Sequence, residues 1–423
     1  MMSAIGKGLI DGILTEDQVV EIVHEALDNS ALDGKRVLVI IPDRTRTAPM
    51  PLMFRTLYDV LAARVKSLDF LVALGTHPPM SVDRIYNLLG ISEQDHQEKY
   101  SKSRFFNHRW NDPETLVSAG AISEETIEEI SGGLFRMPVN LTINKMVTQY
   151  DHVMIVGPVF PHEVVGFSGG NKYLFPGIAG QEIIDFFHWL GAIITSPEII
   201  GTKHTPVRKV VDTAASYIKV DKSCFALVVH GSELAAIYYG TPEQAWSEAA
   251  DLSAKLHIRY TDRTYHTVLS AAPQMYDDIW TAGKCMYKLE PVLADGGRLI
   301  IHAPHIDEIS YTHGKIIDEI GYHVRDYFLA QWDRFKGYPW GVVAHSTHVK
   351  GMGTYENGVE KPRVEVILAT RIPESRCRKV NLGYADPESI RVEDYQGRED
   401  EGVLYVPKAG ECLYRLRGDR ANG

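Results

Sequence analysis

Cysteine is scarce in this chain, and the few cysteines form no recognisable metal or disulfide pattern. The four of them, Cys224, Cys285, Cys377 and Cys412, are widely separated and include no CxxC pair. Neither a zinc knuckle nor a disulfide framework is therefore expected. The N-terminal stretch MMSAIGKGLIDGILTEDQ has no signal-peptide cleavage pattern. Both features predict a reducing, cytoplasmic setting.

The chain also lacks an excess of basic residues and any long apolar run. It has 44 Lys and Arg against 55 Asp and Glu, a formal net charge of -11 and a pI near 5.9. This balance argues against a surface for nucleic acid or an anionic membrane. No apolar run approaches the roughly 20 residues that span a bilayer. We therefore expect a small-molecule partner, and neither nucleic acid nor membrane.

Two nucleotide-binding motifs are missing as well. The stretch GFSGGNK at 166–172 has paired glycines, but it lacks both the glycine spacing of a P-loop and a Ser or Thr after the lysine. No GxGxxG follows an expected strand either. A nucleoside triphosphatase and an enzyme with a dissociable nicotinamide are thus disfavoured.

What the chain does contain is a series of short apolar runs separated by helical patterns. The first set lies at 36–49, 67–80, 150–163 and 224–233. Runs that are continuously apolar indicate strands buried on both faces, as in the parallel sheet of an α/β fold. A second set follows at 266–273, 296–304, 340–347 and 362–373.

These two sets predict an α/β fold with two α/β domains, mainly parallel sheets and an active site in the cleft between them. A length of 423 residues agrees with more than one domain. We expect a cofactor-binding domain over 1–262 and a second domain over 263–399 that closes over the substrate. Residues 400–423 are expected to return to the first domain after a polar linker.

Polar residues follow several expected strands of the first set. Asp43, Arg46, His77 and His162 each come directly after an apolar run. In open α/β sheets, ligands bind beyond the carboxyl ends of the strands, so these side chains should meet at one rim. Arg46 could grip a carboxylate or phosphate, and His77 could act as an acid or base. Capping by Asp43, an exposed Arg46 and a structural His77 are the alternatives.

The stretch HEVVGFSGGNKYLFPGIAGQEIIDFFH, from His162 to His188, concentrates further polar groups. Ser168, Gly169 and Gly170 could expose backbone N–H groups to a phosphate. Lys172 stands among apolar residues, where a lysine can become a nucleophile or simply extend its amine to solvent or a phosphate. His188 shares a face of an expected helix with Asp185, although a lone helical histidine is more often structural.

Three candidates belong to the second set. Lys284 follows the run at 266–273 and could hold an anionic substrate, or be merely exposed. For His345 and His348, metal binding, substrate binding and solvation all stay open. Trp332 could line a pocket or pack in the core.

These residues, in this order, resemble the lactate racemase family that uses a nickel-pincer nucleotide. The matching motifs are DRTR at 43–46, GTH at 75–77 and PHEVVGFSGGNKYLFPG at 161–177, followed by His188. The spacing of ten residues from His162 to Lys172, and of sixteen from there to His188, agrees with the family.

The resemblance implies a role for each matching residue. Lys172 would hold the cofactor covalently, His188 would be the protein ligand to nickel, and His77 and His162 would be the acid/base pair. Asp43, Ser168, Gly169 and Gly170 would contact the cofactor. Arg46 and Lys284 would grip the substrate carboxylate, with Trp280 and Thr281 beside them. Proteins that build and insert the cofactor are implied as partners.

The activity implied is the inversion of C2 in a 2-hydroxy acid by reversible hydride transfer. Lactate-specific members carry a Tyr-Gln pair where this chain has Trp280 and Thr281, so the substrate is expected to differ from lactate. A sugar acid such as gluconate is favoured, because Thr281, His345 and His348 could bond to extra hydroxyls. An oxidoreductase and a non-catalytic binding protein are the alternatives.

Overall fold

The computed structural model describes residues 4–28 and 30–418, which form two compact units. The first unit comprises the described parts of Met1–Phe160, Ser168–Ile184 and Arg208–Leu256. The second comprises Pro161–Phe167, Asp185–Val207 and the described residues from His257 onward. Within the described residues, no helix is both long and apolar enough to cross a membrane.

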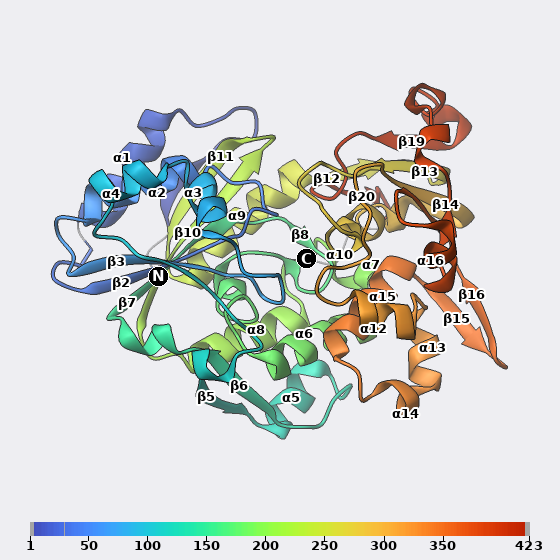
Figure 1. The fold of residues 1–423 in the computed structure, drawn as a ribbon, viewed down its shortest axis with the longest axis horizontal. Coiled ribbons are helices and arrows are strands. Elements are labelled where there is room, and N and C mark those ends of the chain that lie inside the picture. Colours follow the sequence, from blue (N-terminus) through green and yellow to red (C-terminus); the bar gives the residue numbers. More distant parts are fainter. Residues whose placement is uncertain (1–3, 29, 419–423) are drawn as a thin grey trace. The chain divides into compact units, whose positions relative to one another are not determined.

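The first unit is built on a seven-stranded sheet (Figure 1). Its strands, in spatial order, are β1 (Ile5–Gly8), β11 (Glu233–Gly240), β10 (Asp221–His230), β7 (His152–Pro158), β2 (Arg36–Ile41), β3 (Ser67–Val72) and β4 (Phe105–Asn107). The five strands from β10 to β4 are parallel, while β11 runs antiparallel to both of its neighbours, β10 and β1. All four strands expected from the first set of apolar runs are confirmed.

Helices cover both faces of this sheet. On one face, α1 (Glu16–Asp28), α2 (Met50–Leu61) and α3 (Val82–Leu89) share a core with Val37 and Val39 of β2. On the other, α9 (Pro242–His257) approaches β1 and β11, since Leu252 would contact a Cβ at Gly8. The unit also contains α4 (Glu93–Glu98), β5 (Leu116–Ile122), α5 (Glu124–Ser131), β6 (Val139–Asn144) and most of α8 (Pro206–Ser216).

The order of the parallel strands reverses between β2 and β7. From β2 the chain crosses to β3 and β4 on one side, and from β7 it crosses to β10 on the other. Such a reversal leaves a crevice at the carboxyl ends of the two strands, where ligands bind in open α/β sheets.

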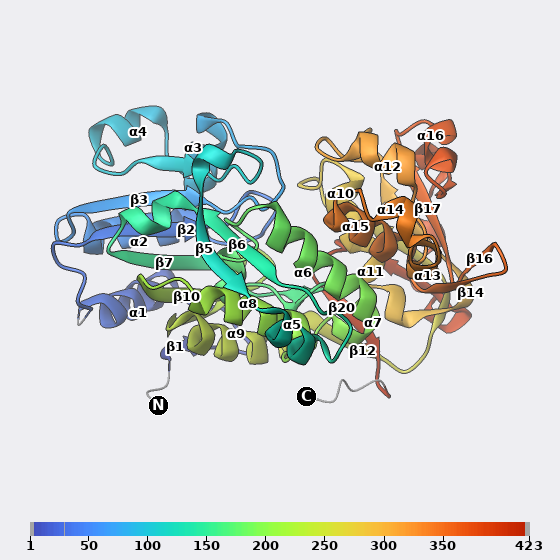
Figure 2. The same ribbon diagram turned by 90° about the horizontal axis from the view of Figure 1, so that it is seen from below.

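The second unit contains a five-stranded parallel sheet (Figure 2). Its order is β18 (Gly383–Tyr384), β17 (Glu365–Thr370), β14 (Leu293–Ala303), β13 (Tyr265–Ala271) and β19 (Val403–Val406). Three two-stranded pairs accompany it: β8 (Pro161–His162) with β9 (Gly166–Phe167), β12 (Ile258–Thr261) with β20 (Leu413–Leu416), and β15 (Gly353–Glu356) with β16 (Val359–Pro362).

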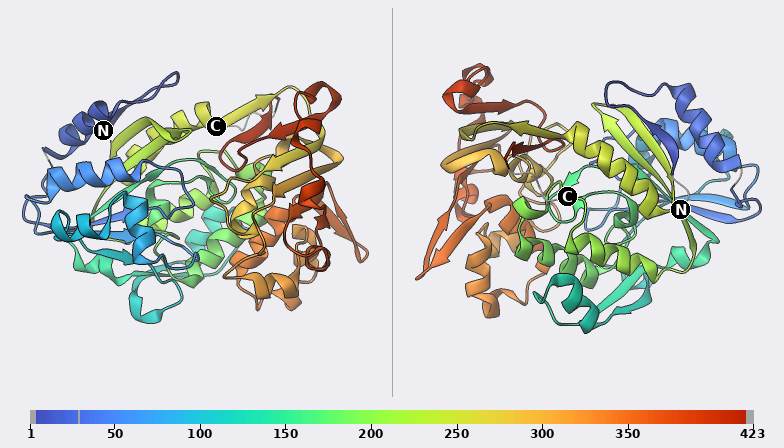
Figure 3. Two further views of the ribbon diagram at one scale, coloured as in Figure 1. Left: turned by 45° about the horizontal axis from the view of Figure 1, so that its top comes forward. Right: turned by 180° about the vertical axis from the view of Figure 1, so that it is seen from behind.

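The second unit also contains several short helices. Figure 3 gives two further views of the ribbon. These helices are α7 (Ser196–Ile199), α10 (Ile279–Ala282), α11 (Lys284–Tyr287), α12 (Gly314–Ile320), α13 (Arg325–Ala330), α14 (Trp332–Phe335), α15 (Trp340–Lys350) and α16 (Glu374–Lys379). The longer α6 (Gln181–Ile194) begins in the first unit and contributes the residues from Asp185 onward to the second.

The structure corrects one expected strand. Residues 340–347 form the start of α15, in which every residue from Gly341 to Lys350 is buried. A helix buried on all sides loses its polar face, so its sequence resembles that of a buried strand. The prediction of a strand here was wrong for that reason.

The C-terminal segment also differs from expectation. Val403–Val406 pairs in parallel with β13, and Leu413–Leu416 pairs with β12, so 400–418 belong to the second unit. Residues 419–423 lie outside the described residues. The division between the units falls after Leu256 rather than at 262, and the second unit gains two earlier segments.

Candidate functional site

A buried carboxylate and a histidine meet where β2 and β3 end. Asp43 follows β2, His77 follows β3, and the Asp43 Oδ2 lies 2.5 Å from His77 Nδ1. Asp43 is 6% exposed, and its Oδ1 accepts hydrogen bonds from the N–H and hydroxyl of Thr45. The expected meeting of these two strand ends is confirmed.

The charge of Asp43 is stabilised despite its burial. Burial raises the pKa of this carboxyl, but the charges of His77 and Arg46 and the bonds from His77 and Thr45 together lower it below its ordinary value. A carboxylate that accepts from Nδ1–H fixes both the ring orientation and the tautomer of a histidine. His77 therefore presents Nε2 as its basic nitrogen.

Arg46 lies on the same loop and is half-buried. Its Nη1 lies 3.1 Å from Thr45 Oγ1, so Thr45 connects the guanidinium to Asp43. The Asp-x-x-Arg motif thus forms one small network at the end of β2.

The turn that carries Lys172 is fixed by two glycines. Gly169 and Gly170 have φ values of 85° and 58°, a region that glycine adopts without strain. A Cβ at Gly169 would lie 2.6 Å from Val159 Cγ2, and one at Gly170 would lie 2.9 Å from Trp246 Cβ. The glycines therefore let the 3-10 turn Gly170–Tyr173 pack against α9.

Ser168 has a structural role in this turn. Its hydroxyl accepts from the Phe160 N–H at 2.9 Å and donates to the Pro158 carbonyl at 3.3 Å, while its own carbonyl accepts from Trp246 Nε1. These contacts tie the turn to the end of β7.

A backbone hydrogen bond joins this turn to the loop of His77, and the charges of the Asp43 loop act on its tyrosine. The Gly75 N–H donates to the Gly177 carbonyl at 2.9 Å, which links the segment before His77 to the one after Lys172. Burial raises the pKa of Tyr173, and the nearby charges of Arg46 and Asp43 also act on it. The half-buried Lys172 thus stands at the crevice between β2 and β7.

A buried polar group behind the turn was missed by the sequence analysis. Asn171 is 1% exposed, and its amide donates to Asp212 at 3.0 Å and to Glu243 at 2.6 Å. Arg208, 3.8 Å from Asp212, lies 4.0 Å above the Trp246 ring. Burial lowers the Arg208 pKa to about 10. These residues come from three separate segments of the chain. Only Asn171 lies in a motif that the sequence had singled out, the stretch GFSGGNK.

In the second unit, His162 ends β8 and is 9% exposed. Its Nδ1 accepts from the Val164 N–H at 3.1 Å, and the Glu163 Oε2 lies 3.2 Å from the same nitrogen. The backbone of Val164 and the carboxylate of Glu163 therefore both hold this face of the ring.

His188 lies in α6, with Asp185 one turn before it. The Asp185 Oδ1 accepts from the Gly341 N–H of α15 at 2.8 Å. The next residue of the helix, Trp189, stacks on Trp332 with ring centroids 4.9 Å apart. Trp332 therefore supports α6 by packing.

Lys284 lies beyond the carboxyl end of β13, where the order of the second sheet reverses between β13 and β19. Its Nζ is 4.7 Å from the centre of the Tyr276 ring. A Cβ at Gly410, on the loop after β19, would lie 3.1 Å from Lys284 Cβ. The lysine thus occupies the position where ligands bind in such sheets.

Trp280 and Thr281 precede this lysine. The Trp280 ring lies between His313 and His345, with centroids 4.5 and 4.1 Å away. Thr281 is 5% exposed, and its N–H donates to Asp278 at the start of α10.

His345 and His348 are buried on α15. Burial lowers the pKa of His345 well below its ordinary value and that of His348 to about 4, so both rings are neutral near pH 7. The Nε2 atoms of both histidines make no hydrogen bond with another described residue. Neither histidine is solvated, which removes one of the three alternatives.

The predicted residues fall into two groups. Asp43, Arg46, His77, Ser168, Gly169, Gly170 and Lys172 lie together in the first unit, and His162, His188, Trp280, Thr281 and Lys284 belong to the second. Within the described residues, no group of three or more His, Cys, Asp or Glu side chains could hold a metal ion.

Comparisons with known proteins bear on this arrangement. Residues 15–199 match the family model of the lactate racemase N-terminal domain. The chain is 34% identical to a protein of known structure from Thermotoga maritima, with a TM-score of 0.88 over 96% of this chain and 99% of the other. The N-terminal part of the chain thus carries the domain of the lactate racemase family.

Two relatives named lactate racemase are less similar in sequence. The lactate racemase of Lactiplantibacillus plantarum is 25% identical over 304 residues, and that of Thermoanaerobacterium thermosaccharolyticum is 24% identical over 300. These regions cover 69% and 68% of this chain, and 66% of each relative, which is just under two thirds.

One solved lactate racemase shares its fold with nearly the whole chain. The lactate racemase apoprotein of T. thermosaccharolyticum has a TM-score of 0.69 with 18% identity, over 96% of this chain and 95% of the other. At that identity the likeness shows the fold alone, which agrees with two mainly parallel α/β units.

Proposed function

We propose that this protein is an isomerase, a racemase or epimerase that inverts C2 of a 2-hydroxy acid. The observation that carries the proposal is the Asp43–His77 pair beside the Lys172 turn at the crevice between β2 and β7. An oriented imidazole next to a fixed lysine is the arrangement that a tethered cofactor and a proton-transfer step require.

The residues fit a nickel-pincer nucleotide attached at Lys172. The lysine lies on a turn whose backbone is held by glycines and by Ser168, and His188 supplies an imidazole, which suits Ni(II). The remaining ligands would come from the cofactor, because the described residues offer no group of three or more ligands. When bound, such a cofactor would supply a reversible hydride acceptor.

The chain's own residues would bind the substrate and move its proton. Arg46 and Lys284 would hold the carboxylate, since a bound acid must keep its position while the stereocentre is inverted. His77 and His162 would act at the C2 hydroxyl. Asp43 orients the ring of His77, and the Val164 N–H and Glu163 lie at Nδ1 of His162, so each imidazole is held in place for proton transfer.

For the substrate we propose a sugar acid such as gluconate rather than lactate. Trp280 and Thr281 replace the Tyr-Gln pair of lactate-specific members, and His345 beside Trp280 has a buried Nε2 with no hydrogen bond to another described residue. We further propose that the protein works in the cytoplasm and receives its cofactor from dedicated biosynthesis and insertion proteins.

The test is intact mass and nickel content after co-expression with a nickel-pincer biosynthesis system. We expect a mass increment with nickel in the wild type and neither in Lys172→Ala, followed by epimerisation of 2-hydroxy acids by the wild type alone. Full activity of Lys172→Ala would remove the tethered cofactor from the proposal. In D2O, internal hydride return predicts little deuterium at C2, whereas full incorporation would indicate proton abstraction from carbon.

A further inference from the structure

Helix α15 packs directly against the face of α6 that carries His188. Gly341 is the second residue of α15, and a Cβ added there would lie 3.2 Å from Asp185 Oδ1 and 3.7 Å from His188 Nδ1. The backbone of α15 therefore lies beside the imidazole, and a side chain at this position would be tight only against Asp185.

Asp185 connects the two helices through a backbone hydrogen bond. The first N–H groups of a helix have no partner within it, and Asp185 Oδ1 accepts that of Gly341 at 2.8 Å. A carboxylate at a helix N-terminus also interacts favourably with the helix dipole. The residue three positions before His188 thus holds α15 against α6.

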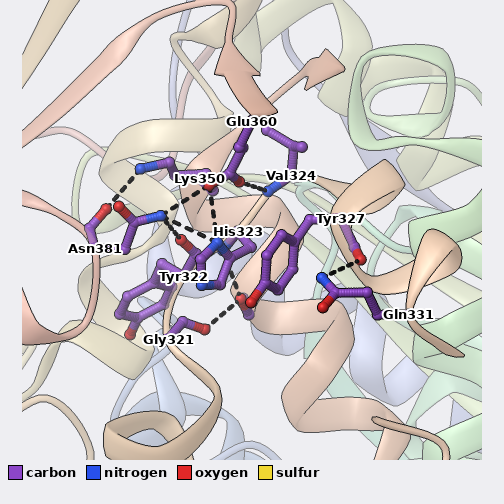
Figure 4. A network of polar contacts seen from close by, with 10 residues as sticks. Gly321, Tyr322, His323, Val324, Tyr327, Gln331, Lys350, Glu360 and Asn381 are labelled. Atoms are coloured by element: carbon purple, nitrogen blue, oxygen red, sulfur yellow. Dashed lines mark hydrogen bonds and ion pairs between the residues drawn. The ribbon is translucent and has the colours of Figure 1, made fainter. Parts of the chain in front are cut away.

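The other end of α15 is held by a partly buried polar network (Figure 4). Ser346 donates to the Gly321 carbonyl at 2.7 Å and accepts from the His323 N–H. Lys350 donates to the Asn381 carbonyl at 2.6 Å, and Glu360 accepts from the side chains of Asn381 and His323. Hydrogen bonds thus hold α15 along its length, and its first turn lies beside His188.

We infer that Asp185 is a positioning residue that, through Gly341 and α15, sets the orientation of the His188 imidazole. This inference rests on the proposed role of His188 as the nickel ligand. Outer groups that orient a metal-binding histidine change metal affinity by about 10- to 100-fold when they are removed, because the ring must otherwise find its binding orientation among several.

The experiment compares nickel release to EDTA from co-expressed wild type, Asp185→Ala, Asp185→Asn and Gly341→Ala. We expect release about 10- to 100-fold faster in Asp185→Ala. Asp185→Asn should be intermediate, because its amide oxygen can still accept from Gly341. Hydrogen exchange of the Gly341 amide, in protein made without the cofactor, should speed up in Asp185→Ala and less in Asp185→Asn.

Gly341→Ala separates orientation from folding. Alanine favours a helix over glycine by about 1 kcal/mol, so α15 should be no less stable, yet its methyl group would push against Asp185 Oδ1, 3.2 Å away, and so disturb the contact that positions His188. Faster nickel release from Gly341→Ala, at an unchanged or higher Tm, would support the inference. This result would hold even if Asp185→Ala failed to fold. Glu182→Gln is the matched control, since Glu182 lies on the same helix and bonds to Asn140 instead.

The outcomes are distinguishable from failure of the proposed function. A wild type that takes up no nickel would overturn the proposed function and this inference with it. A nickel-loaded wild type whose Asp185→Ala and Gly341→Ala variants release nickel at the wild-type rate would overturn the inference alone.

Discussion

At the scale of single residues, the site depends on which nitrogen of each histidine is occupied. Asp43 engages Nδ1 of His77, and the Val164 N–H engages Nδ1 of His162. A carboxylate also lies beside Nδ1 of His162, because Glu163 Oε2 is 3.2 Å from it. An enzyme that must deprotonate one hydroxyl and reprotonate it from another side needs two such groups.

Replacing Asp43 by asparagine should therefore disturb the chemistry more than the fold. The amide introduced by Asp43→Asn can donate to Nδ1, which would move the His77 proton to Nε2 and remove its basic nitrogen. We expect kcat to fall by about 100-fold or more, measured by epimerisation of the best substrate found. Asp33→Asn, an exposed carboxylate paired with Arg64, serves as the control. An Asp43→Asn enzyme of wild-type activity would contradict the role given to the pair.

Asp43→Asn should also change how the free energy of unfolding depends on pH. Because the folded pKa of Asp43 lies below its ordinary value, its stabilising contribution is present above that ordinary value and is lost as pH falls toward the folded pKa. The wild type should lose more unfolding free energy on acidification than Asp43→Asn, as measured by chemical denaturation at a series of pH values.

At the scale of elements, the Lys172 turn depends on how closely backbone can approach α9. Gly170 combines a φ of 58° with a gap too small for a methyl group beside Trp246 and Pro242. Gly133 has a φ of 85°, but nothing lies within 4 Å of its Cβ position. Gly133 is thus required for its backbone conformation alone, whereas Gly170 is required for both its conformation and the lack of a side chain.

Alanine at these two positions should separate the two effects. Gly133→Ala should cost about 1 kcal/mol of unfolding free energy from the backbone alone. Gly170→Ala should cost about 1–3 kcal/mol more through overpacking, and it should reduce the mass increment at Lys172 because the turn must shift. Chemical denaturation and intact mass measure the two quantities. Equal losses in both variants would show that space beside α9 is not limiting.

The elements also show what the sequence could and could not predict. Asp43 and His77 were expected at one rim because continuously apolar runs indicate parallel strands whose carboxyl ends lie together. The bond from Asp185 to Gly341 joins residues far apart in the chain and involves a backbone group, which no side-chain pattern reveals. Helix α15 was mistaken for a strand because all of its faces are buried.

At the scale of the whole molecule, the chain passes between the two units several times. The segments Pro161–Phe167 and Asp185–Val207 leave the first unit for the second and return. As a result, His162 and His188 belong to the second unit although Lys172, between them in sequence, belongs to the first. Apolar runs and a polar linker in the sequence do not reveal that these two short segments, or residues 403–416, belong to the second unit. The reason is that a single sequence does not show which strands pair.

Deletion of residues 403–423 tests this division. It removes β19 from the edge of β13, β20 from β12, and the bond from Lys288 to the Glu411 carbonyl. Hydrogen exchange should show lost protection at Val268–Ile301 in the second sheet, while peptides over Val37–Val72 in the first unit stay protected as an internal control. Loss of protection in the first sheet with the second preserved would return the C-terminal segment to the first unit, as its position after a polar linker had suggested.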